Sequence, residues 1–273
     1  MDRPLLSRIR IYPIKSLDPL ELVETEVGVY SLRHDREFAM VAKDGGYVNG
    51  KRTGRVNQLK VDYDLSKQCI RLGDRVNGFT REFHLVDERI ELEKYLTAFF
   101  DMEVRLIQNT QGELLDIPGA SSVTILSEAS LISLQKDLGT HGLEDLRLRF
   151  RSNLELAGAE AFWEEQFFGE PGTGMRIQVG EVEMIGISPR ARCNVPPRDP
   201  FSGETDKTFI KSMMRSRAGS LPSNSCLPHY GNFYHLTVNT YIPETETGKR
   251  LKVGDPVRIL GPVDLTRGQG GVG

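Results

Sequence analysis

Two arginines and a cysteine lie together in the sequence RARC (Arg190–Cys193), directly after the apolar run Val182–Ser188. We interpret this run as a strand and Pro189 as the residue that ends its hydrogen-bond ladder, because proline has no N–H to donate. A thiol near two guanidinium groups favours its thiolate form, which soft metals such as molybdenum and copper(I) select as a ligand. The stretch therefore predicts a binding site. The alternative is that the arginines are solvated and the cysteine is a small buried apolar residue.

Two other segments place anion-binding groups at the ends of expected strands. Residues 5–12 alternate between apolar and polar side chains, as in a half-buried strand, and Lys15 and Ser16 come directly after them. A lysine and a hydroxyl there can hold an anion by charge and hydrogen bonds. Ser127 follows the apolar segment 123–126 and is a good N-cap for a helix, whose first N–H groups favour a phosphate. A surface lysine and a helix end without a ligand are the alternatives.

Segment 146–153 contains Arg147, Arg149 and Arg151, which alternate with other residues. If the segment is a strand, the three guanidinium groups share one face, because side chains repeat every second residue. Like charges so close together repel each other, so we expect either an anion or solvent between them.

The composition is that of an ordinary globular protein. Of the 273 residues, 38% are hydrophobic and 27% are charged, and the formal net charge is -3. These values give no indication of nucleic-acid binding, although basic residues can still converge on one anion. The three cysteines, Cys69, Cys193 and Cys226, are widely spaced, which favours a reducing compartment over a disulfide framework. We find no signal peptide and no apolar run of spanning length, and therefore expect a cytoplasmic protein with no membrane contact.

The first half of the chain predicts short antiparallel strands. Segments rich in β-forming residues, separated by turn residues, lie at 22–29, 36–42, 59–63 and 69–72. Asp44–Gly46 forms a tight hairpin turn, a helix begins at Asp87, and residues 108–122 link the two halves. The second half predicts a helix from Ser127 to Gly139, a short helix at 161–168, a hairpin of 175–179 and 181–188, a helix at 208–217, and closing strands at 233–240 and 251–260.

Six short motifs, each weak alone, occur in one order along the chain. They are YPIKS (12–16), DR (35–36), ILSEASL (125–131), FRSN (150–153), RC (192–193) followed by DPFSG (199–203), and VGDPV (253–257). Together they resemble the MOSC family, named for the C-terminal domain of molybdenum cofactor sulfurases. The resemblance is closest to two-part members with an N-terminal β-barrel domain, such as the mitochondrial amidoxime reducing component, and it extends to about residue 261.

The resemblance implies a mainly β fold with peripheral helices, of the α+β class. We expect an N-terminal antiparallel β-barrel-like domain at residues 1–115 and a MOSC β-barrel domain at residues 116–261. Residues 262–273 are rich in glycine and are expected to form a flexible tail.

The resemblance also implies that the bound anion is the phosphate of the molybdenum cofactor, with its pterin nearby. A dianionic phosphate and a polar heterocycle need charges and N–H donors. The residues described above place such groups at the ends of the expected strands. Carried over by motif, the cofactor-binding residues are Lys15, Ser16, Arg36, Ser127, Arg151, Asn153, Arg192 and Cys193.

One departure from the family concerns the molybdenum ligand. In the amidoxime-reducing members this ligand is a cysteine, and the motif match places Ser216 at the same position. A serine alkoxide is harder and far more basic than a thiolate. Three possibilities follow: Ser216 binds molybdenum differently, Cys226 reaches in from the next loop, or the chain binds the cofactor without reducing anything. A loop cysteine without a role is the alternative for Cys226.

These residues support two functional hypotheses of different classes. The first is an oxidoreductase that takes electrons from a partner redox protein and reduces a small N-hydroxylated or related N–O substrate, with Ser216 or Cys226 as the catalytic metal ligand. The second is a non-catalytic module that carries or stores the molybdenum cofactor or a sulfur-bearing intermediate. A third possibility is a pocket that has lost the cofactor and binds another phosphate. The sequence has no N-terminal membrane anchor like that of the mitochondrial members, so we do not expect their location.

Overall fold

A computed structural model describes residues 3–115, 123–139, 141–223 and 225–266 of the chain. Its main feature is an eight-stranded sheet with the strand order β15-β11-β12-β13-β9-β10-β1-β2. These strands are β1 (Leu5–Ile11), β2 (Leu20–Leu22), β9 (Val123–Ser127), β10 (Leu154–Ala157), β11 (Thr173–Val179), β12 (Val182–Ala191), β13 (His235–Tyr241) and β15 (Val257–Asp264). The fold is mainly β with peripheral helices, as expected.

The first strand joins the sheet formed by the second half of the chain. β1 pairs antiparallel with β10, with Ile9 opposite Leu154, and β2 pairs along its other edge. The apolar alternation of the sequence produces this arrangement, because Ile9 and Ile11 are fully buried in one core cluster with Leu154. The expected division at residue 115 therefore does not separate the sheets. Another link is β14 (Arg250–Lys252), which pairs with β3 (Glu24–Glu26).

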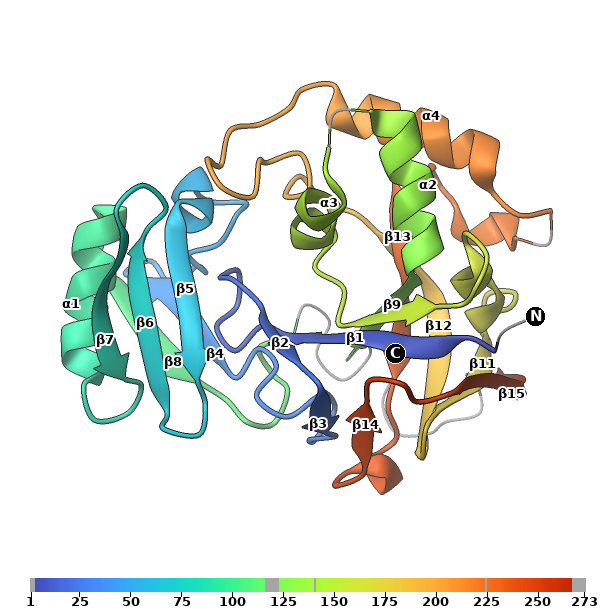
Figure 1. Ribbon diagram of the computed structural model, residues 1–273, viewed down its shortest axis with the longest axis horizontal. Helices are drawn as coiled ribbons and strands as arrows, with labels where there is room; N and C mark the ends of the chain where they lie inside the picture. Colours follow the sequence, from blue (N-terminus) through green and yellow to red (C-terminus); the bar gives the residue numbers. More distant parts are fainter. Residues whose placement is uncertain (1–2, 116–122, 140, 224, 267–273) are drawn as a thin grey trace.

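The rest of the first half forms a second β unit with its own core, drawn on the left of Figure 1. It consists of β4 (Phe38–Ala42) paired with β8 (Val104–Gln108), the meander β5 (Leu59–Asp64), β6 (Cys69–Asp74) and β7 (Gly78–His84), and helix α1 (Arg89–Phe100). The hairpin turn is confirmed, since Val41 bridges to Tyr47 across it. The segment expected as one strand at 22–29 is instead divided between β2 and β3.

Three helices cover one end of the large sheet and enclose a third apolar cluster (Figure 1). They are α2 (Glu128–Leu138), α3 (Leu143–Phe150) and α4 (Phe209–Ser220). The Ser127 cap is confirmed, because its Oγ accepts a hydrogen bond of 3.2 Å from the Ser130 N–H. Gly139 ends α2 in the left-handed conformation, as expected for a C-cap glycine.

The predicted strand at 146–153 is wrong. Its first part is helix α3, which buries Leu146 and Phe150 and carries Glu144 and Asp145 in its first turn. Apolar residues four apart and acidic residues near the N-terminus are both helix signals, and they outweighed the short alternation. The three arginines therefore do not share a strand face.

Three smaller expectations also need correction. Pro189 does not end its strand, since it pairs with Val238 and β12 continues to Ala191 with irregular register on both sides of the proline. The helix expected at 161–168 is only a 3₁₀ turn, η2 (Trp163–Phe167). The expected tail is strand as far as Asp264, while residues 267–273 lie outside the described part. Within the described ranges, no helix is both long and apolar enough to span a membrane.

The loop after β12 ties the large sheet to the N-terminal unit. The Arg198 Nε donates to the Gly50 carbonyl oxygen at 2.7 Å, and the Gln58 amide donates to the Ser202 carbonyl oxygen at 2.8 Å. Gly203 adopts φ +78° against the backbone of Gly54, which leaves no room for a Cβ. This loop and β1 together hold the two units around the residues described next.

Candidate functional site

Tyr12, the residue directly after β1, joins three segments that are distant in sequence. Its side chain is fully buried, its N–H donates to Asp35 Oδ1 at 2.8 Å, and its hydroxyl donates to the Ser152 carbonyl oxygen at 3.2 Å. The turn after β1, the DR motif and the loop after α3 therefore meet at one ring. Burial away from water raises the pKa of the Tyr12 hydroxyl, so this hydroxyl stays protonated at neutral pH.

Two guanidinium groups lie against the Tyr12 ring. The Cζ atoms of Arg36 and Arg151 are 4.4 and 4.0 Å from its centroid. Arg36 is anchored by the Asp35 carboxylate and donates to Asn153 Oδ1 at 3.1 Å. The Arg151 side chain, in contrast, makes no hydrogen bond and no ion pair with any described residue. Enclosure by the surrounding chain, with the Arg36 charge nearby, lowers the pKa of Arg151. Arg151 is therefore a half-buried cation without an ion pair to any described carboxylate.

The residues that surround this ring have strained backbones. Ser16, Arg36 and Arg151 have φ angles of 74°, 52° and 52°, in the left-handed region that residues other than glycine seldom adopt. Each such residue costs on the order of 1 kcal/mol or more, and such residues cluster at binding sites. Backbone hydrogen bonds hold two of these residues in place: the Arg36 N–H donates to the Tyr12 carbonyl oxygen and the Arg151 N–H to the Arg147 carbonyl oxygen, both at 2.9 Å.

Asn153 connects the residues around Tyr12 by hydrogen bonds. It is 2% exposed, and its Nδ2 donates to the Arg10 carbonyl oxygen at 3.0 Å and to Asp35 Oδ2 at 3.1 Å. Its Oδ1 accepts from Arg36 and from the Thr124 N–H. With both amide atoms engaged, Asn153 positions Arg36. The predicted contact of Asn153 with a cofactor remains a prediction. Lys15 lies on the same turn as Tyr12, with Nζ 3.0 Å from the Leu114 carbonyl oxygen.

A row of polar residues continues from Asn153 across the large sheet. Thr124 lies opposite Asn239, and Asn239 lies opposite Ser188, at the same level of β9, β13 and β12. Asn239 Oδ1 accepts a hydrogen bond of 2.8 Å from Arg190. We call Asn153, Thr124, Asn239 and Ser188 the polar row. The sequence analysis missed Thr124 and Asn239, although a polar residue inside an apolar strand is a usable signal.

The RARC stretch reaches the same region from the other side. Arg192 Nη2 donates to the Phe150 carbonyl oxygen at 2.8 Å, one residue before Arg151. Cys193 is exposed, and its carbonyl oxygen accepts a hydrogen bond of 3.1 Å from the Tyr234 hydroxyl. Of the predicted cofactor residues, the structure thus places Arg36, Arg151 and Asn153 around Tyr12, with Lys15 and Ser16 on the adjoining turn. Arg192 approaches through the Phe150 carbonyl oxygen, and Cys193 follows it in the chain.

Ser127 does not join them. It is fully buried at the helix-covered end of β9, with its Oγ 2.7 Å from the Ser130 Oγ. Three residues along a strand separate it from Thr124, about 10 Å by the rise of a strand. Its hydroxyl is used to cap α2, so the geometry gives it a structural role.

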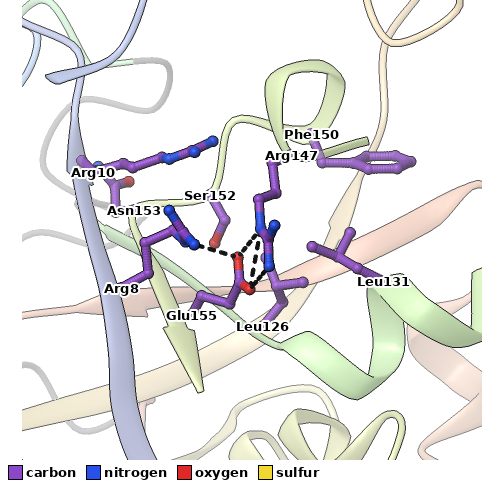
Figure 2. A pocket seen from close by; sticks show the side chains of 9 residues that line it. All are labelled: Arg8, Arg10, Leu126, Leu131, Arg147, Phe150, Ser152, Asn153 and Glu155. Carbon is purple, nitrogen blue, oxygen red and sulfur yellow. Dashed lines mark hydrogen bonds and ion pairs between the residues drawn. The ribbon is translucent and has the colours of Figure 1, made fainter. Parts of the chain in front are cut away.

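The two arginines of α3, Arg147 and Arg149, are paired with carboxylates of the protein. Figure 2 shows the Arg147 guanidinium against the Glu155 carboxylate, with Arg8 approaching from the opposite side. Arg147 Nη2 lies 2.6 Å from Glu155 Oε1 and 2.8 Å from Glu128 Oε1. Arg149 Nε lies 2.6 Å from Asp145 Oδ1. Of the three arginines in segment 146–153, only Arg151 is available to an external anion.

Comparison with known proteins finds two family models that match the chain. Residues 3–101 match the MOSC N-terminal beta barrel domain, and residues 83–258 match the MOSC domain. The chain belongs to the MOSC family. "Mitochondrial amidoxime reducing component 2" of Bos taurus is 26% identical over 298 residues, covering 92% of this chain and 82% of its own length.

Molybdenum cofactor sulfurases are similar over only part of their length. The sulfurase of Caenorhabditis briggsae is 24% identical over 94% of this MOSC chain, which spans 36% of that relative. The human sulfurase is 21% identical over 82% of this chain, which spans 30% of it. Among solved structures, the YuaD protein of Bacillus subtilis aligns over 94% of both chains with 10% identity and a TM-score of 0.41.

The two expected metal ligands of this MOSC protein, Ser216 and Cys226, both lie near acidic side chains. The Ser216 hydroxyl donates to Asp137 Oδ2, between α4 and α2. Burial and the nearby Glu170 carboxylate raise the pKa of the Cys226 thiol, which disfavours the thiolate that metal binding requires. In the described ranges, no three His, Cys, Asp or Glu side chains are grouped as a metal site. The roles of Ser216 and Cys226 as metal ligands remain predictions.

Proposed function

We propose that this MOSC protein binds the molybdenum cofactor, with the cofactor's phosphate held at the Tyr12 cluster. We give this name to Tyr12 and the residues near it: Lys15, Ser16, Asp35, Arg36, Arg151 and Asn153. The observation that carries the proposal is Arg151, a half-buried guanidinium that stacks on Tyr12 beside Arg36 and has no ion pair or hydrogen bond from its side chain in the described chain. Leaving such a cation unpaired is costly, so a site of this kind is stabilised by an anion from outside. The names of the curated relatives, which include molybdenum cofactor sulfurases, support the choice of this anion.

The residues of the cluster have separate roles in this proposal. Arg36 and Arg151 supply two positive charges to a dianionic phosphate, and the planar guanidinium groups favour bidentate hydrogen bonds to its oxygens. Lys15 and Ser16 add an ammonium and a hydroxyl from the turn after β1. In this proposal, Thr124, Asn239 and Ser188 of the polar row lie along the edge of the pterin. Tyr12, Asp35 and Asn153 fix the positions of the arginines before any ligand binds.

We further propose that the bound cofactor is used to reduce an N–O bond. In this reaction R–NHOH, two electrons and two protons give R–NH₂ and water. The cofactor supplies the redox metal and oxygen-atom transfer, and a partner redox protein supplies the electrons. The protein contributes orientation and electrostatic stabilisation. Three relatives with 82% of their length covered are named as amidoxime reducing components, which favours an amidoxime as the substrate class.

A non-catalytic cofactor carrier is the second candidate. The placement of Ser216 against Asp137 and of Cys226 beside Glu170 favours it, because neither side chain is presented as a metal ligand. A carrier needs only the phosphate and pterin contacts.

The test is the cofactor content of protein purified from a host that makes the cofactor. Molybdenum is measured by elemental analysis and pterin by the fluorescence of its oxidised form. We expect near-stoichiometric amounts of both in the wild type and strong loss in Arg151→Met. Arg258→Met, at an exposed position of β15, is the matched control and retains both. Wild-type protein that is folded and contains neither would refute cofactor binding.

A second assay separates the enzyme from the carrier. Cofactor-loaded protein is given an aromatic amidoxime with a low-potential chemical reductant, and amidine formation is followed. Turnover establishes the reductase, whereas full cofactor content without turnover by any donor favours the carrier.

A further inference from the structure

Strand β13 contains a bulge beside the polar row. Val238 lies opposite Pro189 and His235 lies opposite Ala191 on β12. Two residues of β13, Leu236 and Thr237, therefore oppose the single residue Arg190. A bulge of this kind redirects side chains locally and is frequent next to functional sites.

Thr237 has an unfavourable backbone conformation in this bulge. Its φ is 71°, in the left-handed region. Bulges usually place glycine there, and a β-branched residue with positive φ is a true outlier. Glycine would relieve the strain, so the threonine side chain is retained against a conformational cost. Observed strain of this type is a reason to look for a functional role.

The Thr237 hydroxyl also has no partner. Thr237 is 3% exposed, and its Oγ1 is buried without a hydrogen bond to any residue in the described part of the chain. A buried hydroxyl without a partner loses its hydrogen bonds to water and gains none in return. Strain and an unsatisfied hydroxyl thus occur in the same residue.

The register places this hydroxyl on the face of the sheet that carries the polar row. Residues opposite each other in an antiparallel pair point to the same face, and Arg190 points to the face of Asn239, with which it is hydrogen-bonded. Leu236 packs with Leu126 in the cluster under the helices, and Leu126 lies on the same face as Thr124. Thr237 therefore lies between the helix-covered end of this face and the polar row.

We propose that Thr237 is a ligand-contacting residue whose hydroxyl forms a hydrogen bond with the polar edge of the bound pterin. This assignment rests on the proposed function, in which the phosphate lies at Arg151 and the pterin extends over the polar row. The bulge fixes the position of the Thr237 side chain. In this proposal the pterin forms the hydrogen bond that the Thr237 hydroxyl lacks within the described chain.

Two substitutions on one strand test this role in protein without cofactor. Thr237→Val removes only the hydroxyl and keeps the branched shape. Thr240→Val is the matched control, since the Thr240 hydroxyl is fully buried and donates to the Val123 carbonyl oxygen at 2.9 Å. In urea unfolding, we expect Thr237→Val to leave the midpoint unchanged or raise it, because an unsatisfied group is removed. Thr240→Val is expected to lower the midpoint, because an acceptor loses its donor.

Cofactor retention gives the second readout. Pterin loss from loaded protein is followed by the fluorescence of the oxidised pterin. We expect Thr237→Val to lose pterin about three- to tenfold faster than the wild type, the effect of one neutral hydrogen bond. Thr237→Ser retains the hydroxyl and is expected to lose pterin at close to the wild-type rate.

The outcomes distinguish this assignment from the proposed function. A loss of stability in cofactor-free Thr237→Val that equals that of Thr240→Val would show a structural hydroxyl and overturn the assignment. An unchanged rate of pterin loss in Thr237→Val would also overturn it while leaving cofactor binding intact. Wild-type protein that never carries pterin would overturn the proposed function and the assignment together.

Discussion

Glu164, in η2 beneath helix α2, is expected to make the folding stability of this protein fall as the pH rises through neutrality. The side chain is 2% exposed, and its Oε2 accepts a hydrogen bond of 3.0 Å from the Ser130 hydroxyl. Burial raises the pKa of Glu164 from 4.5 to about 7, and the neighbouring Glu165 carboxylate acts in the same direction. The folded protein therefore holds a proton on Glu164 at pH values where the unfolded chain has lost it.

The sign and size follow from proton linkage. Below pH 4.5 both states are protonated, and the stabilisation from Glu164 is fully present. As pH rises from 4.5 to about 7, only the folded state holds the proton, so the free energy of unfolding falls by about 1.4 kcal/mol per pH unit. Over this window the loss amounts to about 3 kcal/mol, and above pH 7 the contribution no longer changes.

Glu164→Gln removes this titration and keeps the size of the side chain. Unfolding free energies of both proteins are measured by urea titration between pH 4.5 and 8, and only their difference is compared. We expect the wild type to lose about 3 kcal/mol relative to the variant across this range. A constant offset caused by the new amide does not affect the comparison.

Glu160→Gln is the matched control, because Glu160 is exposed in the same loop. The difference in unfolding free energy between Glu160→Gln and the wild type is expected to stay nearly constant with pH. A Glu164→Gln difference that varied no more than that of Glu160→Gln would refute the reasoning, since it would show that Glu164 is ionised in the folded protein at acidic pH.

Three further substitutions test the roles given to other residues. Arg147→Met leaves the buried Glu155 carboxylate without its main partner and is expected to lower the unfolding free energy by about 3 kcal/mol in urea titrations; no change would show that Arg8 alone suffices. Cys226→Ala is expected to leave molybdenum and pterin content unaltered, and loss of molybdenum alone would make Cys226 a ligand after all. Gly203→Ala forces a side chain against Gly54 at positive φ and is expected to cost about 2–4 kcal/mol by the same titration; wild-type stability would mean that the loop moves freely.

Local patterns in the sequence predicted the elements that depend on few neighbours. The α2 helix has a serine cap, a stripe of leucines and a terminal glycine within one short segment, and all three signals agree. The Asp44–Gly46 turn is equally self-contained. Segment 146–153 failed because its alternating residues fit two periods, and burial of Leu146 and Phe150 beneath α2 selected the helical one.

The assembly of the site depends on contacts that no local pattern encodes. Asp35 and Asn153 are 118 positions apart, and their hydrogen bond brings the DR motif to the loop after α3. The motifs predicted Asn153 and Ser127 as cofactor contacts, and the structure adds that both side chains form hydrogen bonds within the chain. The bulge at Thr237 is likewise a property of pairing between β12 and β13, and it has no signature in the sequence of β13 alone.

The charges of the buried arginines make the strongest argument for an anion site. Arg147, Arg149 and Arg217 each lie within 2.8 Å of a carboxylate oxygen supplied by the protein. Burying a guanidinium without a counter-charge is unfavourable, and here the fold avoids it three times. Arg151 immediately follows the helix that carries two of these arginines, but it makes no such ion pair with a described residue. It is half-buried and lies on an aromatic ring next to a second arginine. The proposed phosphate would supply the counter-charge that these two guanidinium groups share.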